Sequence, residues 1–336
     1  ELSVRLGVTD RKLRSGFNAQ RLAYEDWYRF GLKLFAHYRK VRRIFVAAWY
    51  FPDSMGLIAA ARQYRIESID VQHGKQGPYQ AMYAGWTWIP QNGFPNLPDK
   101  YWCWGSPSCE HILRSSPGRS THRPFAGGYP WLGWYRDNLW PDKNLAQPCS
   151  ATHRVLITLQ PPQGANDQPI PSALVQALYE STHVSHVVIR NHPNWAGGLS
   201  YAKGRFPANS RVRVDVREPR CPVLDDLLWC THHITAYSSC CYEAEALGRP
   251  TLLVGDDAKM IYAQSIAEGR FEWAQSTDKT TIRGWLDRAS RASVCNGKES
   301  IRSSYLLPDV SEYGGELLTA SDAGGRGISK TTAAAE

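Results

Sequence analysis

The sequence predicts an α/β protein of two domains, each built around a parallel sheet. Residues 42–73 show the pattern of strand, helix and strand within about 30 residues, which is typical of a parallel βαβ unit with a right-handed crossover. The same alternation begins again near residue 154. The chain has 336 residues, which is too long for one ordinary core and suits two domains of about 150 residues each.

The first half of the chain supplies the elements of the first predicted sheet. Two compact apolar strands enclose a helix for which Ser54 is the expected N-cap. Residues 74–98 are too rich in Gly, Pro and Trp for regular structure, so we expect a long functional loop there. The expected strands are 42–51, 66–73 and 99–105, and the expected helices are 54–66 and 106–116.

The second half repeats the alternation after residues 127–153, a connection rich in turn residues. Gly248 is the expected C-cap of one of its helices. The small, polar end of the chain predicts disorder. We therefore expect an N-terminal domain at 1–135, a C-terminal domain at 136–310 and a disordered tail at 311–336. The expected strands are 154–160, 186–193, 212–218, 233–239 and 250–257, and the expected helices are 169–182, 223–232, 240–248, 258–269 and 279–290.

Composition and charge restrict the class of partner. The sequence has no run of about 18 apolar residues, so no transmembrane helix is predicted. The net charge of +8 favours anionic partners such as nucleotides, phospholipid headgroups or acidic polysaccharide. We find no helix-turn-helix, zinc-finger or RNP-like signature, so nucleic acid is not an expected partner.

The eight cysteines include no C-x-x-C pair, which argues against a zinc ribbon or a thioredoxin-like site. Cys240 and Cys241 are adjacent and make a poor disulfide framework. We therefore expect reduced thiols and a cytoplasmic location. The chain begins at Glu1 without Met or a signal peptide, and we expect sequence to be missing upstream, so that it is either a fragment of a longer protein or a trimmed chain.

Residues 21–43 form a basic and aromatic segment with the pattern of an amphipathic helix. Two interpretations stay open. In one, the helix packs on its own domain and its basic face is solvated. In the other, the helix docks on an anionic membrane surface, so that the protein contacts the inner face of the cell membrane peripherally.

Three predicted strands end on polar side chains. In open α/β sheets, ligands bind beyond the carboxyl ends of parallel strands, so these ends indicate a binding site. Pro193 disfavours helical geometry at the residue before it, so Arg190 and His192 are placed to meet a nucleotide phosphate or base. The three ends are His73, the run Arg190-Asn191-His192-Pro193, and the run Tyr237-Ser238-Ser239.

Ser238 and Ser239 stand where a predicted strand gives way to a helix. The N-terminus of a helix presents unpaired N–H groups that favour phosphate, and two hydroxyls add hydrogen bonds there. A plain serine N-cap also explains this pair. Glu243 lies one turn later and is expected either to accept hydrogen bonds from a ribose or to pair with Arg249.

The order of these motifs resembles a known family. A His-Pro pair, then Ser-Ser at a strand end followed by Glu, Gly and Pro, is similar to bacterial GT-B glycosyltransferases of surface-polysaccharide synthesis. These are the sialyltransferases of capsule and lipooligosaccharide, the Kdo transferases and the teichoic-acid glycerophosphotransferases, which use cytidine-nucleotide donors. The resemblance covers residues 42–270 and implies a GT-B fold, with two Rossmann-like domains whose parallel sheets face a cleft.

The resemblance implies a glycosyltransferase that moves Kdo or a sialic-acid-like sugar from a CMP donor to a bacterial surface glycan such as lipopolysaccharide or capsule. His192 and Pro193 would contact the nucleotide, and Ser238 and Ser239 its phosphate. Ala236 stands where the teichoic-acid enzymes have Asp, so donor identity stays open. The alternatives are a UDP-sugar, GDP-sugar or CDP-glycerol donor, or a sugar-nucleotide epimerase on the same fold. A carbohydrate-binding module without turnover is a further class.

The candidate base is His73. Gln72-His73-Gly74 is similar to a His-Gly of the teichoic-acid enzymes, whose His is a proposed base. An unperturbed histidine titrates near pH 6.5 and is therefore available as a neutral base at working pH. Two alternatives stay open for this segment. His73 is a turn histidine bonded to backbone, or Asp70 is the base or orients His73.

Metal ions and cofactors are not expected. The sequence has no D-x-D motif, so we expect metal-independent, inverting transfer with the nucleotide sugar as the donor substrate. Leaving-group charge would be met by Ser238, Ser239 and either Arg190 or Lys259. The expected donor site is Arg190, Asn191, His192, Pro193, Tyr237, Ser238, Ser239, Glu243 and Lys259, and the expected acceptor site is Gln72, Gly74, Lys75, Gln76, Tyr79, Tyr83 and Trp86.

Overall fold

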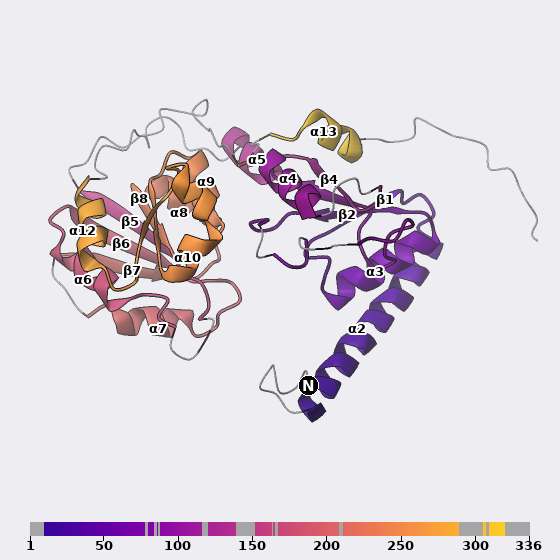
Figure 1. Ribbon diagram of the computed structural model, residues 1–336, viewed down its shortest axis with the longest axis horizontal. Coiled ribbons are helices and arrows are strands. Elements are labelled where there is room, and N and C mark those ends of the chain that lie inside the picture. Colours follow the sequence, from indigo (N-terminus) through magenta and orange to yellow (C-terminus); the bar gives the residue numbers. More distant parts are fainter. Residues whose placement is uncertain are drawn as a thin grey trace, which may run out of the picture.

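The computed structural model contains two parallel sheets, each covered by helices (Figure 1). This confirms the predicted α/β class and the GT-B arrangement of two Rossmann-like domains. The structure describes residues 10–77, 80–83, 86, 88–115, 120–138, 152–162, 164, 167–207, 211–288, 305–306 and 309–319.

The first sheet has the order β1-β2-β3-β4, and every pair of neighbours is parallel. Alternate residues of a strand face opposite sides, so Trp102 packs with Ile69 on one face while Tyr101 and Cys103 pack with Ile58 on the other. The strands are β1 (Arg43–Val46), β2 (Glu67–Val71), β3 (Lys100–Cys103) and β4 (Arg123–Ala126), and the helices are α2 (Asp10–His37), α3 (Pro52–Gln63), α4 (Ser106–Ser115) and α5 (Pro130–Asn138).

The second sheet has the order β7-β6-β5-β8-β9-β10 and is also parallel throughout. This is the order of a doubly wound nucleotide-binding sheet, and its direction reverses between β5 and β8. The strands are β5 (His153–Thr158), β6 (Val184–Arg190), β7 (Arg213–Arg217), β8 (His232–Thr235), β9 (Thr251–Val254) and β10 (Glu272–Ala274). The helices are α6 (Ser172–Glu180), α7 (Gly198–Arg205), α8 (Val223–Trp229), α9 (Cys240–Ala246), α10 (Asp256–Ile261), α11 (Ala263–Ala267) and α12 (Lys279–Arg288).

Helices cover both faces of the second sheet. Leu156 and its neighbours pack under α8 and α9, whereas Val155 and Ile157 pack under α6 and α12. Burial on both faces explains why these strands read as nearly continuous apolar runs in the sequence.

Several local predictions were wrong. Phe51, not Ser54, is the N-cap of α3, because Pro52 takes the first helical position and needs no hydrogen-bond partner for a backbone N–H. The helix predicted at 258–269 is divided at Tyr262, whose hydroxyl donates to the carbonyls of Tyr237 and Ser238. Four short elements were not predicted, namely β4, α5, α7 and β10. By contrast, Gly248 has the positive φ of 65° expected at a C-cap.

The predicted disordered tail contains helix α13 (Glu312–Thr319), so the prediction was wrong for these residues. Leu317 is buried against Ile69 and Trp102 of the first sheet, and its carbonyl accepts a hydrogen bond from Arg43. This apolar contact orders a segment whose composition alone indicates disorder. Residues 320–336 lie outside the described part. The predicted domain limit at residue 135 falls inside α5.

Two expectations from composition concern thiols and membranes. The six cysteines in the described part of the chain are free, while Cys149 and Cys295 lie outside it. Among the described helices, none combines the length and the apolar character needed to cross a bilayer.

Helices α2 and α3 approach closely because two glycines lie at their crossing. A Cβ atom on Gly31 would lie 2.6 Å from the Cβ of Ala60. A Cβ on Gly56 would lie 2.7 Å from the carbonyl oxygen of Tyr24 and 2.8 Å from the amide nitrogen of Tyr28. Backbone atoms cannot turn aside as a flexible side chain does, so the position of α2 depends on Gly56 having no side chain.

The substitution Gly56→Ala is therefore expected to lower the free energy of unfolding by about 1–3 kcal/mol, because the added methyl group separates the two helices. Gly16→Ala in α2 is the matched control, since a Cβ there meets no atom within 4 Å. That control should gain about 0.5–1 kcal/mol from helix propensity. Chemical denaturation of both variants checks the pair, and equal effects would contradict the close approach.

Candidate functional site

Asp70 lies at the carboxyl end of β2 and is 1% exposed. Its Oδ1 accepts the backbone N–H of Trp49 at 3.0 Å, and its Oδ2 accepts the hydroxyl of Tyr83 at 2.8 Å. Burial raises the pKa of the carboxyl to about 7, and the two hydrogen bonds oppose that rise. Both carboxylate oxygens are bonded inside the domain. Asp70 therefore fixes the positions of Trp49 and Tyr83 and does not contact a ligand directly.

His73 is exposed two residues beyond β2, and its Nε2 lies 3.3 Å from the hydroxyl of Tyr50. Although the residue reaches solvent, the protein around the ring desolvates the imidazolium and lowers the pKa of His73. The ring is therefore neutral at pH 7 and able to accept a proton. Burial and the nearby Asp70 raise the pKa of Tyr50, which keeps its hydroxyl protonated.

Tyr50 was not predicted from the sequence. It stands at the end of the run 42–51, and its aromatic character was assigned to the buried strand. The available signal was its position, since it follows β1 just as His73 follows β2, and both strands are parallel. Carboxyl ends of neighbouring parallel strands meet at one edge, so the pairing of Tyr50 with His73 follows from the topology.

The loop after His73 contacts both domains. The ammonium group of Lys75 donates to the carbonyl of Ile261 and lies 3.9 Å from the centre of the Tyr262 ring. Burial lowers the pKa of Lys75 to about 8. The hydroxyl of Tyr305 accepts the backbone N–H of Gln76 at 3.1 Å and donates to its carbonyl at 3.0 Å. This loop is therefore tied to the second domain and to the C-terminal segment.

The predicted acceptor residues do not gather into one exposed surface. Gln72 is buried, and its amide donates to Gly74 and accepts from the N–H of Trp104 at 2.7 Å. Tyr83 is buried and bonded to Asp70. Trp86 is half-buried, and its ring packs edge-on against Trp49. Tyr79 lies outside the described residues.

Arg190 and Asn191 have partners inside the second domain. Arg190 donates to Oδ2 of the buried Asp226 at 2.7 Å, and Arg217 donates to Oδ1 of the same carboxylate at 2.6 Å. Breaking such a buried pair is costly, so Arg190 is committed to the fold. The Asn191 amide donates to the carbonyl of Trp195 at 2.8 Å and fixes the turn after β6.

His192 is half-buried, and its Nδ1 accepts the backbone N–H of Asn194 at 3.1 Å. Burial lowers its pKa, so the ring is neutral at pH 7. Pro193 is exposed beside it. Lys259 is also exposed, and its ammonium group lies 4.6 Å from the centre of the Trp273 ring.

Ser238 and Ser239 precede α9 as predicted. Ser238 is buried, and its hydroxyl accepts the N–H of Cys240 at 3.3 Å. Glu243 does not pair with Arg249, and its expected contact with a ribose stays a prediction. It is 5% exposed, accepts the hydroxyl of Tyr129 at 2.7 Å, and has its pKa raised by burial. Arg249 instead donates to the carbonyls of Leu227 and Leu228.

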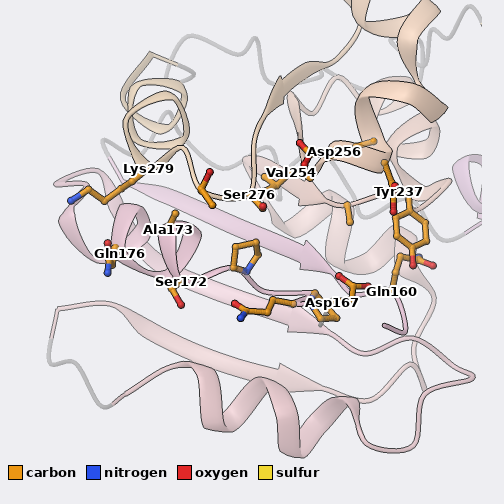
Figure 2. Close-up of a pocket in the computed structure, with 18 residues that line it drawn as sticks. Gln160, Asp167, Ser172, Ala173, Gln176, Tyr237, Val254, Asp256, Ser276 and Lys279 are labelled. Carbon is orange, nitrogen blue, oxygen red and sulfur yellow. The ribbon is translucent and has the colours of Figure 1, made fainter. Parts of the chain in front are cut away.

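A pocket of about 880 Å³ opens at the carboxyl edge of the second sheet (Figure 2). It includes Gln160 after β5 and Tyr237 after β8, and therefore lies at the point where the strand order reverses. Figure 2 shows Gln160, Asp167 and Tyr237 at one end and Lys279 with Gln176 at the other. The lining residues are Gln160, Asp167, Gln168, Pro169, Pro171, Ser172, Ala173, Gln176, Ala236, Tyr237, Val254, Gly255, Asp256, Asp257, Ala258, Ser276, Thr277 and Lys279.

Polar and apolar surface contribute about equally to the pocket, and the net charge of its side chains is negative. Three aspartates line it, while the ammonium group of Lys279 is paired with Glu180 at 2.9 Å. Helices α6 and α12 both begin at this edge, so their first backbone N–H groups add partial positive charge. Of the predicted donor residues, Tyr237 alone is part of the described pocket lining.

The structure also shows why most of the pocket was missed. Its polar residues follow strands that were predicted, but Ser276 follows β10, which was not. Among the residues that the structure describes, no three His, Cys, Asp or Glu side chains form a group able to hold a metal ion.

The raised pKa of Asp70 should make the free energy of unfolding depend on pH. Its folded pKa of about 7 lies above the value near 3.9 of an unfolded chain, so its contribution is greatest at low pH and is lost as pH rises toward 7. We expect Asp70→Asn, which stays neutral, to gain up to about 1.4 kcal/mol per pH unit relative to the wild type between pH 4 and 7. Urea unfolding at several pH values measures this gain, and parallel curves would contradict it.

The comparisons with known proteins concern the fold. No protein-family model matches the sequence, and no curated protein matches it. Among solved structures, the S. aureus MnaA-UDP complex has a TM-score of 0.58 at 14% identity, covering 89% of this chain and 80% of that one. The Neisseria meningitidis UDP-GlcNAc 2-epimerase bound to UDP-GlcNAc gives 0.55 at 14%, covering 81% and 76%. Anabaena HepE with UDP-glucose gives 0.52 at 14%, covering 87% and 82%. The chain therefore shares its two-domain fold with nucleotide-sugar-binding proteins.

Proposed function

We propose that the protein is an enzyme that binds a uridine diphosphate sugar and epimerises the sugar. The observation that carries this proposal is the pocket at the point where the strand order of the second sheet reverses. This is the place where doubly wound sheets bind nucleotides, and the pocket volume of about 880 Å³ suits a small ligand. The similar structures support a uridine nucleotide, since their names include UDP, UDP-GlcNAc and UDP-glucose.

The charges of the pocket suggest that the ribose and the diphosphate of the nucleotide bind different groups of the lining. Carboxylates accept hydrogen bonds from hydroxyl groups, so Asp167, Asp256 and Asp257 suit a ribose. They repel phosphate, and Lys279 is already neutralised by Glu180. We propose that the diphosphate binds backbone N–H groups at the helix N-termini, because these carry partial positive charge without a side chain.

The arrangement of the first domain favours an epimerase over a transferase. A transferase needs a surface for a second substrate, but the predicted acceptor residues Gln72 and Tyr83 are buried and bonded within the domain. An epimerase acts on one bound substrate and needs a proton acceptor at the edge of the site. His73 is exposed, neutral and bonded to Tyr50, and we propose it as this base. The similar structures give no support to a CMP donor or to Kdo.

Nucleotide binding should raise the melting temperature, since a ligand that binds only the native state stabilises it. We expect UDP at 100 times its Kd to add about 2.7 kcal/mol to the free energy of unfolding, and CMP to add less. Ala236→Phe fills the pocket and should remove the UDP effect. Ala196→Phe is the control, because Ala196 is exposed and is not among the pocket residues. A thermal-shift titration measures all three proteins.

A response of both variants equal to that of the wild type would place the nucleotide outside this pocket. A stronger response to CMP than to UDP would restore the cytidine donor predicted from the sequence. No response to any nucleotide would remove the proposed function.

The reaction is tested with UDP-GlcNAc in deuterated water, followed by proton NMR. Inversion at C2 breaks the C–H bond there: the base takes the proton while the electron pair expels UDP from C1, and UDP adds back after a proton enters C2 from the opposite face. An epimerase in deuterated water therefore produces a second sugar and incorporates deuterium at C2. Transfer would instead release UDP only when an acceptor is added. We expect His73→Gln to lower kcat by about 10²–10⁴-fold with the Kd for UDP unchanged. Wild-type activity in this variant would contradict the assignment of the base.

The pH profile gives a second test of His73. Its pKa lies below the usual value of about 6.5, so the ring stays neutral at lower pH than a free histidine does. We expect kcat/KM to be constant from pH 7 down to about pH 6.5 and to fall only below it. Tyr50→Phe should shift the pH at which kcat/KM begins to fall, because it removes the hydroxyl that lies 3.3 Å from Nε2 of His73.

A further inference from the structure

We propose that helix α2 docks the protein on an anionic lipid surface through an aromatic stripe formed by Trp27, Phe30 and Tyr38. These side chains are 40%, 50% and 56% exposed. The proposal does not depend on the proposed function, because the stripe runs along α2 beside its crossing with α3 and shares no residue with the pocket.

The spacing of the stripe places its members on one side of the helix. Intervals of three and four residues return to the same face, and Leu34 lies between Phe30 and Tyr38 at the same spacing. The hydrogen bond from the N–H of Tyr38 to the carbonyl of Leu34 continues the helical turn beyond His37. The rings of Trp27 and Phe30 meet edge to face with centroids 5.4 Å apart. The exposed apolar area is therefore continuous between Trp27 and Phe30, while the half-buried Leu34 packs in the cluster of Phe35.

The other side of α2 holds the stripe in a fixed position. Phe35 is buried against α3, Tyr28 packs in the same cluster, and Gly31 lets the two helices approach closely. Figure 1 shows α2 lying along α3 and extending beyond it toward the N-terminus. The stripe thus lies along one flank of a helix that the first domain anchors.

The basic side chains around the stripe favour an anionic partner. Residues 21–43 contain seven Arg and Lys and two acidic residues. Both acids are paired on the helix itself, Glu25 with Arg21 at 2.5 Å and Asp26 with Arg29 at 3.9 Å. Lys33 and Lys40 are exposed near the stripe. Aromatic rings beside basic side chains fit the headgroup region of an anionic bilayer, where the rings bury and the cations stay wet.

A second copy of the chain fits this surface less well. A symmetric dimer through the stripe would bring the same basic flanks of two α2 helices together, and like charges oppose such a contact. An anionic lipid surface meets both the apolar and the basic components at once. We therefore assign the stripe to lipid.

The test is flotation of the full chain with phosphatidylcholine vesicles that contain either no anionic lipid or 30% phosphatidylglycerol. We expect binding to the anionic vesicles alone, reduced by 0.5 M salt. The double variant Trp27→Ser/Phe30→Ser should lower the partition coefficient at least about tenfold, because two exposed rings lose their burial. Phe17→Ser is the matched control. Phe17 is 64% exposed and lies about 140° from Phe30 and about 80° from Trp27 around the helix, so its loss should lower binding much less than the double variant does.

Circular dichroism melting of each variant shows whether it is folded. If the double variant is unstable, Lys33→Glu with Lys40→Glu provides a second test, and it should lose anionic binding while keeping the rings. Equal binding to both kinds of vesicle, equal binding of wild type and variants, or no binding would overturn the proposal. A concentration-dependent dimer that the double variant abolishes, without vesicle binding, would assign the stripe to a second copy and would also overturn it.

Discussion

The hydrogen-bonded stack of Tyr305 connects the two domains beside the loop that follows His73. Its ring lies on that of Tyr242 in the second domain, with centroids 3.7 Å apart, while its hydroxyl bonds the backbone of Gln76 and the hydroxyl of Ser108 in the first. Burial raises the pKa of Tyr305 to about 12, so the hydroxyl keeps its proton and serves as donor and acceptor together. The loop that follows His73 is therefore held against the helix that follows Ser238.

Much of the fold was predictable because parallel sheets leave a simple pattern. Strands that are buried on both faces appear in the sequence as apolar runs. The alternation of these runs with helical patterns predicted both domains. The prediction failed where tertiary contacts override local composition. Helix α13 has a polar surrounding sequence, yet burial of Leu317 orders it. Strand β4 contains Arg123 and Pro124, and proline within a run argues against a strand. These elements are determined by partners far away in the chain, which a local pattern cannot contain.

The candidate site was predictable only as positions at strand ends. The topology does bring the end of β2 beside the end of β1, and Asp70 and His73 lie there as predicted. What the sequence could not show is which polar side chains are already used by the fold. Arg190 is taken by Asp226, Gln72 by Gly74 and Trp104, and Glu243 by Tyr129. Burial and hydrogen bonding, not residue type, separate these structural groups from the exposed His73.

The basic side chains that give the protein its positive net charge are not concentrated in the pocket. A net charge of +8 favours anionic partners, and the simplest inference is a basic ligand site. The pocket instead carries three aspartates and a lysine already paired with Glu180, whereas basic residues are concentrated along α2 and the segment after it. The proposed phosphate binding then depends on backbone N–H groups inside the pocket, where salt screens an interaction less than at an exposed surface. The Arg and Lys side chains of α2 lie on the protein surface, where salt screens their charge. The proposed nucleotide binding should therefore be less sensitive to salt than the proposed attachment to lipid.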